Sequence, residues 1–166
     1  FISKGDIIDI PLKDFIELNK SSQDMFKGFC VGVDYENKQC NIDPYLYGLW
    51  LGDGTSKASS ITSADEEIVN YLNKWTNNNR LKINKIGNYR YDISTGTNEG
   101  GPRRNVFTNF LKDNDLWGNK HIINEYKYNS TDVRLNLLAG LIDSDGSMTH
   151  NCYEIVFKNE KLAYDT

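Results

Sequence analysis

The sequence lacks several features that would place it in a common class of protein. Its 166 residues include three cysteines and no run of about 18 apolar residues, so we expect no transmembrane helix. An odd cysteine count without a Cys-x-x-Cys pair argues against a disulfide framework and a zinc site. The start shows no basic segment followed by an apolar one, so we expect no signal peptide. These absences favour an intracellular protein without a membrane partner, located in the nucleus of a eukaryote and otherwise in the cytoplasm.

A positive net charge is also missing. The formal charge of −4 argues, at first sight, against binding to nucleic acid. The charges are unevenly distributed, however, because residues 74–134 contain 11 basic and 6 acidic residues, whereas residues 1–73 contain 6 and 12. Local charge governs contact with phosphates more than the total charge does. Residues 74–134 therefore remain a candidate surface for nucleic acid.

The sequence does contain one short motif twice. Residues 46–54 are LYGLWLGDG and residues 138–146 are LAGLIDSDG. In this register Gly48 aligns with Gly140. A glycine inside a helix costs roughly 1 kcal/mol relative to alanine, and close approach of a second backbone would explain it. We therefore expect two helices that pack against each other at Gly48 and Gly140.

Each copy of the motif predicts a buried helix that ends at an Asp-Gly pair. We expect these helices at residues 44–53 and 132–143, with Asp43 capping the first and Ser130 or Thr131 capping the second. The second helix should bury five apolar side chains: Leu135, Leu137, Leu138, Leu141 and Ile142.

Packing at the two glycines would bring Asp53 and Asp145 together at the ends of their helices. Neighbouring carboxylates repel each other unless one is protonated or a cation lies between them. Oxygen ligands favour Mg²⁺, which keeps several waters and completes its shell with phosphate oxygens. Metal-bound water attacking a phosphodiester is the matching chemistry. We therefore predict hydrolysis with Mg²⁺, or with Mn²⁺ in its place.

Residues 138–146 match the nine-letter name of the LAGLIDADG homing endonucleases at eight positions, with Ser144 as the exception. The first copy is similar to the form common in intein-encoded members. The resemblance implies an α+β fold of two αββαββα repeats, with antiparallel saddle-shaped sheets on the DNA major groove. It also implies that Asp53 and Asp145 are catalytic and bind the metal. Asp143 has no acidic counterpart in the first copy, so we interpret it as structural or as a support for the site residues, and not as catalytic.

The likeness extends beyond the two motifs. The block Lys120-His121-Ile122-Ile123 resembles the segment that supplies the family's active-site lysine, although Ile123 replaces a proline. By the same resemblance, residues 1–42 correspond to a linker or to the edge of an intein splicing domain in the parent chain. Residues 43–129 would be the first repeat, and residues 130–166 the start of a truncated second repeat. We expect the chain as written to lack full cleavage of both strands.

The region between the motifs predicts a hairpin with strands at 81–86 and 89–95, turning at Gly87-Asn88. One face would carry five polar side chains: Lys82, Asn84, Arg90, Asp92 and Ser94. Such a face suits a β-ribbon that reads base edges in double-stranded DNA over a long recognition site. Arg103 and Arg104, in the loop that follows, are candidates for phosphate contacts. An ordinary solvated sheet face is the alternative.

Other patterns complete the expected fold. We expect short strands and an extended linker in residues 1–42. A capping box at Ser63–Glu66 predicts a helix that ends near Asn77, and residues 105–114 predict another. An irregular connection should span residues 116–129. The tail from Tyr153 is similar to the first strand and helix of the second repeat.

Three hypotheses of function follow. The favoured one is the site-specific homing endonuclease of an intein, in which Asp53, Asp145 and Lys120 act on double-stranded DNA. The second is a catalytically inactive nucleic-acid-binding module of the same fold, such as a maturase or a degenerate intein. The third is a purely structural pair of helices. The tripeptide His150-Asn151-Cys152 resembles the end of an intein. It follows Asp145-Gly146 by only four residues, however, and no splicing N-terminus precedes it, so we do not assign splicing to it.

Overall fold

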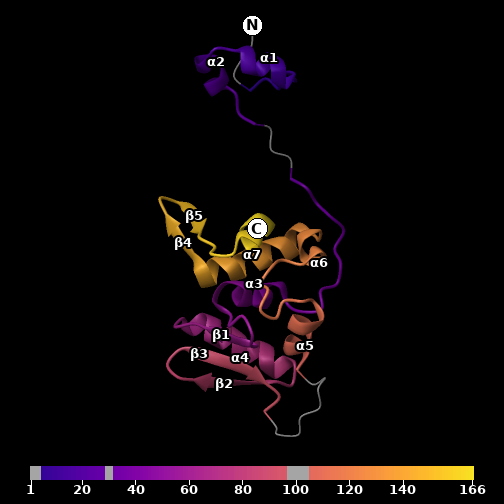
Figure 1. Ribbon diagram of the computed structural model, residues 1–166, viewed down its shortest axis with the longest axis vertical. Coiled ribbons are helices and arrows are strands. Elements are labelled where there is room, and N and C mark those ends of the chain that lie inside the picture. The colour runs from indigo at the N-terminus through magenta and orange to yellow at the C-terminus, as the bar shows by residue number, and fades with distance from the viewer. Residues whose placement is uncertain (1–4, 29–31, 97–104) are drawn as a thin grey trace. The chain divides into compact units, whose positions relative to one another are not determined.

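The computed structural model describes residues 5–28, 32–96 and 105–166 (Figure 1). The chain divides into two units between Val33 and Asp34. None of the helices in the described ranges is long and apolar enough to span a bilayer.

The first unit contains two short helices, α1 (Leu12–Glu17) and α2 (Lys20–Met25). The expectation of short strands in residues 1–42 is therefore wrong for its described part. Asn19 caps α2 by accepting from Ser22 N at 2.9 Å. The Gln23 amide donates to the carbonyls of Phe15, Ile16 and Leu18 at 2.9–3.3 Å. These bonds satisfy orphan carbonyls at the end of α1, and a side chain beyond the helix supplies them.

The second unit is an α+β domain with two small antiparallel sheets, which confirms the α+β class. Its elements are α3 (Pro44–Asp53), β1 (Ser60–Thr62), α4 (Glu66–Asn78), β2 (Lys82–Ile86), β3 (Arg90–Ser94), α5 (Val106–Asp113), α6 (Asn124–Lys127), α7 (Thr131–Asp145), β4 (Gly146–Thr149), β5 (Cys152–Ile155) and α8 (Glu160–Asp165). The first sheet has the order β1-β3-β2, and the second pairs β4 with β5.

Helix α3 lies between α7 on one side and α4, α5 and the three-stranded sheet on the other (Figure 1). Asp43 caps α3 through Tyr45 N at 2.9 Å, and Pro44 occupies the first turn, as expected. Every residue from Leu46 to Leu51 is buried. Edge-on aromatic contacts fix α3 against α5, including Trp50 with Phe107 at 6.4 Å between ring centroids.

The contact between α3 and α7 is reciprocal around the two glycines. A methyl group at Gly48 would overlap the carbonyl oxygen of Leu137, and one at Gly140 would overlap that of Tyr45. Tyr45 and Leu137 are equivalent residues, since each directly precedes its copy of the motif. Each methyl group would also lie 3.0 Å from the Cα of the other glycine. Only residues without a Cβ allow this approach, so the predicted contact between Gly48 and Gly140 is present.

Helix α7 extends slightly beyond its predicted ends, and its cap differs from the prediction. Ser130 occupies the N-cap position but makes no capping bond with its side chain. Asp34 accepts from Thr131 N at 3.2 Å instead. The predicted burial is correct for Leu137 and Leu141 but wrong for Leu135, which is 57% exposed, while Leu138 and Ile142 are partly buried. The reason is that α7 packs on α3 through one face, and Leu135 lies outside that face.

The β2–β3 hairpin forms as predicted, with Gly87 at a positive φ of 72° in the turn. Helix α4 starts later than the capping-box pattern indicates. Asp65, rather than Ser63, is its N-cap and accepts from Glu67 N at 2.8 Å. The Ser63 hydroxyl accepts from Asp65 N at 3.1 Å and forms a turn before the helix. The connection at residues 116–129, expected to be irregular, contains the short helix α6.

The internal repeat continues past the two motifs. Gly54 bridges Ile61 after α3, and Gly146 pairs with Ile155 after α7. In both copies the next helix has its N-cap four residues after that isoleucine, at Asp65 for α4 and at Asn159 for α8. The first buried residue of each helix then follows three residues later, at Ile68 and Leu162.

His150 and Asn151 form the turn between β4 and β5. Their φ values are 49° and 64°, and the pairing of Thr149 with Cys152 encloses the two residues. Two positive φ angles in a two-residue loop are typical of hairpin turns whose twist matches that of the strands. His150 and Asn151 therefore have a local role as the hairpin turn, and Cys152 begins β5.

Candidate active site

The predicted acidic residues lie at the adjacent ends of α3 and α7. One helical turn beyond the glycine pair, Gly52 faces Ser144, its counterpart in the second copy. A Cβ atom at Gly52 would collide with the Ser144 hydroxyl and would lie 3.3 Å from Asp145 Cβ. Asp53 follows directly after Gly52. The helix pair therefore delivers Asp53 and Asp145 to the same end of the α3–α7 contact.

Lys120 completes this cluster from the connection before α6. Its ammonium group donates to the carbonyl oxygens of Leu51 at 3.0 Å and Gly52 at 2.9 Å. It also lies over the Trp50 ring, 5.2 Å from the centroid. These carbonyls are among the last ones of α3, which have no partners within the helix. Lys120 thus acts as a cationic cap at the negative end of the α3 dipole.

The charges in the cluster influence each other. Burial raises the pKa of the Asp53 carboxyl, the nearby Asp145 charge raises this pKa further, and Lys120 lowers it. Burial lowers the pKa of Lys120 to about 8, although Asp145 and Asp53 both act to raise it. A lysine with a pKa near 8 can gain or lose a proton close to neutral pH. A perturbed lysine beside two carboxylates is typical of a functional site.

The donor set fits a divalent cation that keeps part of its water shell. Within residues 5–28, 32–96 and 105–166, no three or more His, Cys, Asp or Glu residues form a cluster. A closed protein cage is therefore excluded for that part of the chain. Two carboxylates at the negative ends of two helices still leave open coordination positions, which Mg²⁺ fills with water or phosphate oxygens. Asp53 and Asp145 are the residues that would hold such an ion.

Asp143 lies outside this cluster of charges. Its carboxylate accepts a hydrogen bond from the Tyr45 hydroxyl at 2.7 Å. This bond joins the last turn of α7 to the first turn of α3. Burial, followed by the hydrogen bond to Asp143, raises the pKa of Tyr45. The interpretation of Asp143 as a structural residue agrees with these contacts.

The predicted DNA-reading residues share one face of the three-stranded sheet. Strand pairing places Lys82 opposite Ser94, Asn84 opposite Asp92, and Arg90 next to Ile86. The Asn84 amide donates to the Ser94 hydroxyl at 2.8 Å. Ile61 and Ile93 lie on the other face and are buried in the core with α4. Arg103 and Arg104 lie outside the described residues.

Two parts of the site were not predicted from the sequence. One is the Gly52–Ser144 contact. With Gly48 and Gly140, these residues place small side chains four positions apart on each helix, a spacing typical of closely packed helix pairs. That spacing is visible in both motifs and could have revealed it. The other is Trp50, which donates to Ala58 O at 2.9 Å and presents its ring to Lys120. No signal in a single sequence distinguishes this tryptophan from an ordinary core residue.

Comparison with curated proteins gives a partial match to a DNA helicase. The replicative DNA helicase DnaB of Mycobacterium intracellulare is 33% identical to this chain over 134 residues. These residues are 80% of this chain but 19% of the helicase, so the chain spans about a fifth of that relative's length. No protein-family model matches the sequence.

Proposed function

We propose that this chain is the nuclease module of an intein-type homing endonuclease, with the LAGLIDADG fold, and that it hydrolyses phosphodiesters of double-stranded DNA. The observation that carries the proposal is the convergence of Asp53, Asp145 and Lys120 where α3 and α7 end. These two helices contact each other through glycines. Mg²⁺ bound there would act as a Lewis acid on the phosphate and the attacking water. The two aspartates would hold the ion, and Lys120 Nζ would exchange a proton.

The sheet supports the proposal by offering a polar face of the right kind. Lys82 and Arg90 are exposed on it, and Asn84 and Asp92 carry the amide and carboxylate groups that pair with base edges. The Asp92 carboxyl is half-buried. Burial raises its pKa, and the nearby Arg90 charge lowers it. Phosphate attraction would come mainly from the net positive region at residues 74–134.

The helicase match bears on where such a module would reside. A match to about a fifth of a DnaB chain fits an element inserted in a larger host protein. We propose an intein splicing domain in the parent chain as the partner of the module.

Metal binding gives the first test. Titration calorimetry with Mg²⁺, and with Mn²⁺ in a parallel series, should show binding to the unaltered chain. Asp53→Asn and Asp145→Asn should each weaken it at least about tenfold, since one of two charged ligands is lost. Asp143→Asn is the matched control on the same helix and should bind as the unaltered chain does. Equal binding by all four proteins would refute the site.

Cleavage gives the second test. The chain is incubated with supercoiled plasmids carrying random inserts, with and without Mg²⁺, and nicked products are sequenced. We expect metal-dependent nicks at a preferred sequence, which Lys120→Met and the two aspartate variants abolish. The inactive DNA-binding module is the second candidate, and the two bonds that already restrain Lys120 favour it. It predicts DNA binding that needs no metal, together with no nicking.

A further inference from the structure

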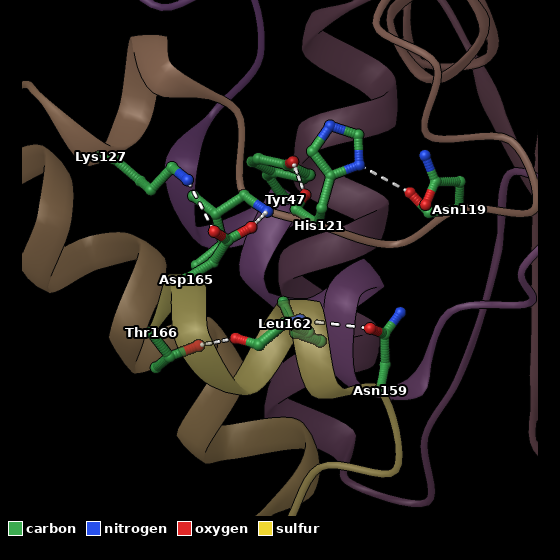
Figure 2. A network of polar contacts seen from close by, with 9 residues as sticks. Tyr47, Asn119, His121, Lys127, Asn159, Leu162, Asp165 and Thr166 are labelled. Carbon is green, nitrogen blue, oxygen red and sulfur yellow. Dashed lines mark hydrogen bonds and ion pairs between the residues drawn. The ribbon is translucent and has the colours of Figure 1, made fainter.

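The segment Asn119–Ile123, which carries Lys120, belongs to no helix or strand. Its shape must therefore come from hydrogen bonds made by its neighbours. Tyr47 of α3 donates its hydroxyl hydrogen to His121 O at 2.5 Å. The His121 ring contacts Asn119 O through Nδ1 at 2.8 Å. Figure 2 shows both contacts next to the last helix of the chain.

Two further bonds come from α8 and its N-cap residue Asn159, which belong to the second copy of the repeat. Asn159 Nδ2 donates to the carbonyl of Lys120 itself at 2.9 Å. Asp165 Oδ2 accepts from Ile122 N at 3.0 Å. Asp165 also forms an ion pair with Lys127 at 2.6 Å, with side-chain exposures of 11% and 26% (Figure 2). Helix α8 therefore holds this segment at both sides of His121.

We propose that Asn159 and Asp165 of α8 are positioning residues that fix Lys120 against the end of α3. The inference rests on the proposed function, because it explains how the second repeat places a group of the active site. It goes beyond that function by making α8 a determinant of the lysine's state, although α8 contributes no group to the aspartate pair.

Asn159 performs two tasks that can be separated. Its side-chain oxygen caps α8 by accepting from Leu162 N at 3.2 Å, while its amide nitrogen bonds Lys120 O. Serine is an equally good N-cap residue, but its side chain is shorter and has no amide group that could donate to Lys120 O. Asn159→Ser should therefore preserve α8 and remove the bond to Lys120 without adding a charge.

Asn105 offers a matched control. It caps α5 through Phe107 N at 3.1 Å and donates its amide to Ile93 O at 2.7 Å. Asn105→Ser thus removes the same kind of bond at a place that does not touch residues 119–123. Asp165→Ala serves as a second test of the same inference, because it removes the acceptor for Ile122 N.

The experiment follows the Lys120 side chain by NMR in the whole chain labelled with ¹³C-lysine, without metal or DNA. Lys120→Arg identifies the signal. A lysine released from its two carbonyls and from burial should return toward its ordinary behaviour. We expect Asn159→Ser and Asp165→Ala to raise the pH midpoint of Lys120 by about one pH unit, and Asn105→Ser to leave it unchanged.

Unchanged midpoints in both α8 variants, or an equal rise in Asn105→Ser, would overturn the inference. Circular dichroism checks that α8 and α5 remain folded. Because this readout needs no cleavage, an inactive chain with the expected midpoints would contradict the nuclease but not the positioning role. If the chain does nick DNA, Asn159→Ser should slow single-turnover nicking about tenfold and leave the DNA dissociation constant unchanged.

Discussion

Helices α3 and α7 carry the same motif and make the same contact with each other, but their other surroundings differ. The whole stretch Leu46–Leu51 of α3 is buried, whereas α7 buries only Leu137, Gly140 and Leu141. The close contacts of Gly48 with Leu137 and of Gly140 with Tyr45 are nevertheless equivalent. The motif therefore specifies the contact of α3 with α7 around Gly48 and Gly140, which we call the seam, and not the environment on the other faces of the two helices.

The same comparison explains why the two acids of the candidate site differ in exposure. Asp53 is half-buried at the end of the enclosed helix, and Asp145 is exposed at the end of the open one. Lys120 bonds the carbonyls of α3, at Leu51 and Gly52. One symmetric seam thus supports two acids in different electrostatic environments. Four predictions would sharpen or break this comparison.

The largest effect is expected at the seam itself. Gly48→Ala and Gly140→Ala should each destabilise the fold by about 3 kcal/mol or more, because each methyl group meets backbone atoms that cannot turn away. Reciprocity predicts equal losses, measured as free energies of unfolding in urea. Gly28→Ala is the control, since no atom lies within 4 Å of its added Cβ. A clear inequality between the two seam variants would break the proposed symmetry.

The next effect distinguishes the two faces of α7. Leu137→Ala should cost about 2.5 kcal/mol, because Leu137 is 5% exposed and truncation leaves a cavity against α3. Leu135→Ala, two residues earlier and 57% exposed, should change the unfolding free energy by less than about 0.5 kcal/mol. Similar losses at both positions would mean that the outer face of α7 is covered in solution.

These contrasts show what a single sequence can predict. The ends of α3 follow from local rules, because Asp43, Pro44 and the Asp-Gly pair act on residues next to them. The glycine contact follows from the repeat of the motif. The cap of α7 could not be predicted, since Asp34 lies far away in the sequence. The exposure of Leu135 was missed for a similar reason, because an apolar pattern does not say how many neighbours surround a helix.

The candidate site also combines residues that the sequence could place with residues that only the tertiary structure places. Asp53 and Asp145 could be placed together because a repeated motif implies a repeated geometry. Lys120 was placed by resemblance, and the structure adds its bonds to Leu51 and Gly52. The roles of Asn159 and Asp165 depend on a tertiary contact between α8 and a segment without regular structure. No spacing rule connects those residues.

A smaller effect should appear in the pH dependence of stability without metal. Burial lowers the folded pKa of Lys120 to about 8 from its ordinary value of 10.5. The unfolded chain therefore binds more protons between these values, and stability should rise with pH there. Relative to Lys120→Met, the gain between about pH 8 and 9.5 should be about 1 kcal/mol after allowance for solvent screening. A parallel pH dependence in both proteins would show that Lys120 is solvated.

The smallest effect compares the two aspartates directly. The folded pKa of Asp53 is raised, first by burial and then by Asp145, so its ionised form destabilises the native state above that pKa. Asp53→Asn should stabilise the metal-free chain by about 0.5 kcal/mol at pH 7, since it also removes a negative charge from a helix C-terminus. The gain should vanish near pH 3, where the carboxyl is protonated in both states. Asp145→Asn, at the exposed position, should stabilise less, and thermal unfolding at the two pH values measures both. A larger gain at Asp145 would mean that α7, and not α3, encloses the site in solution.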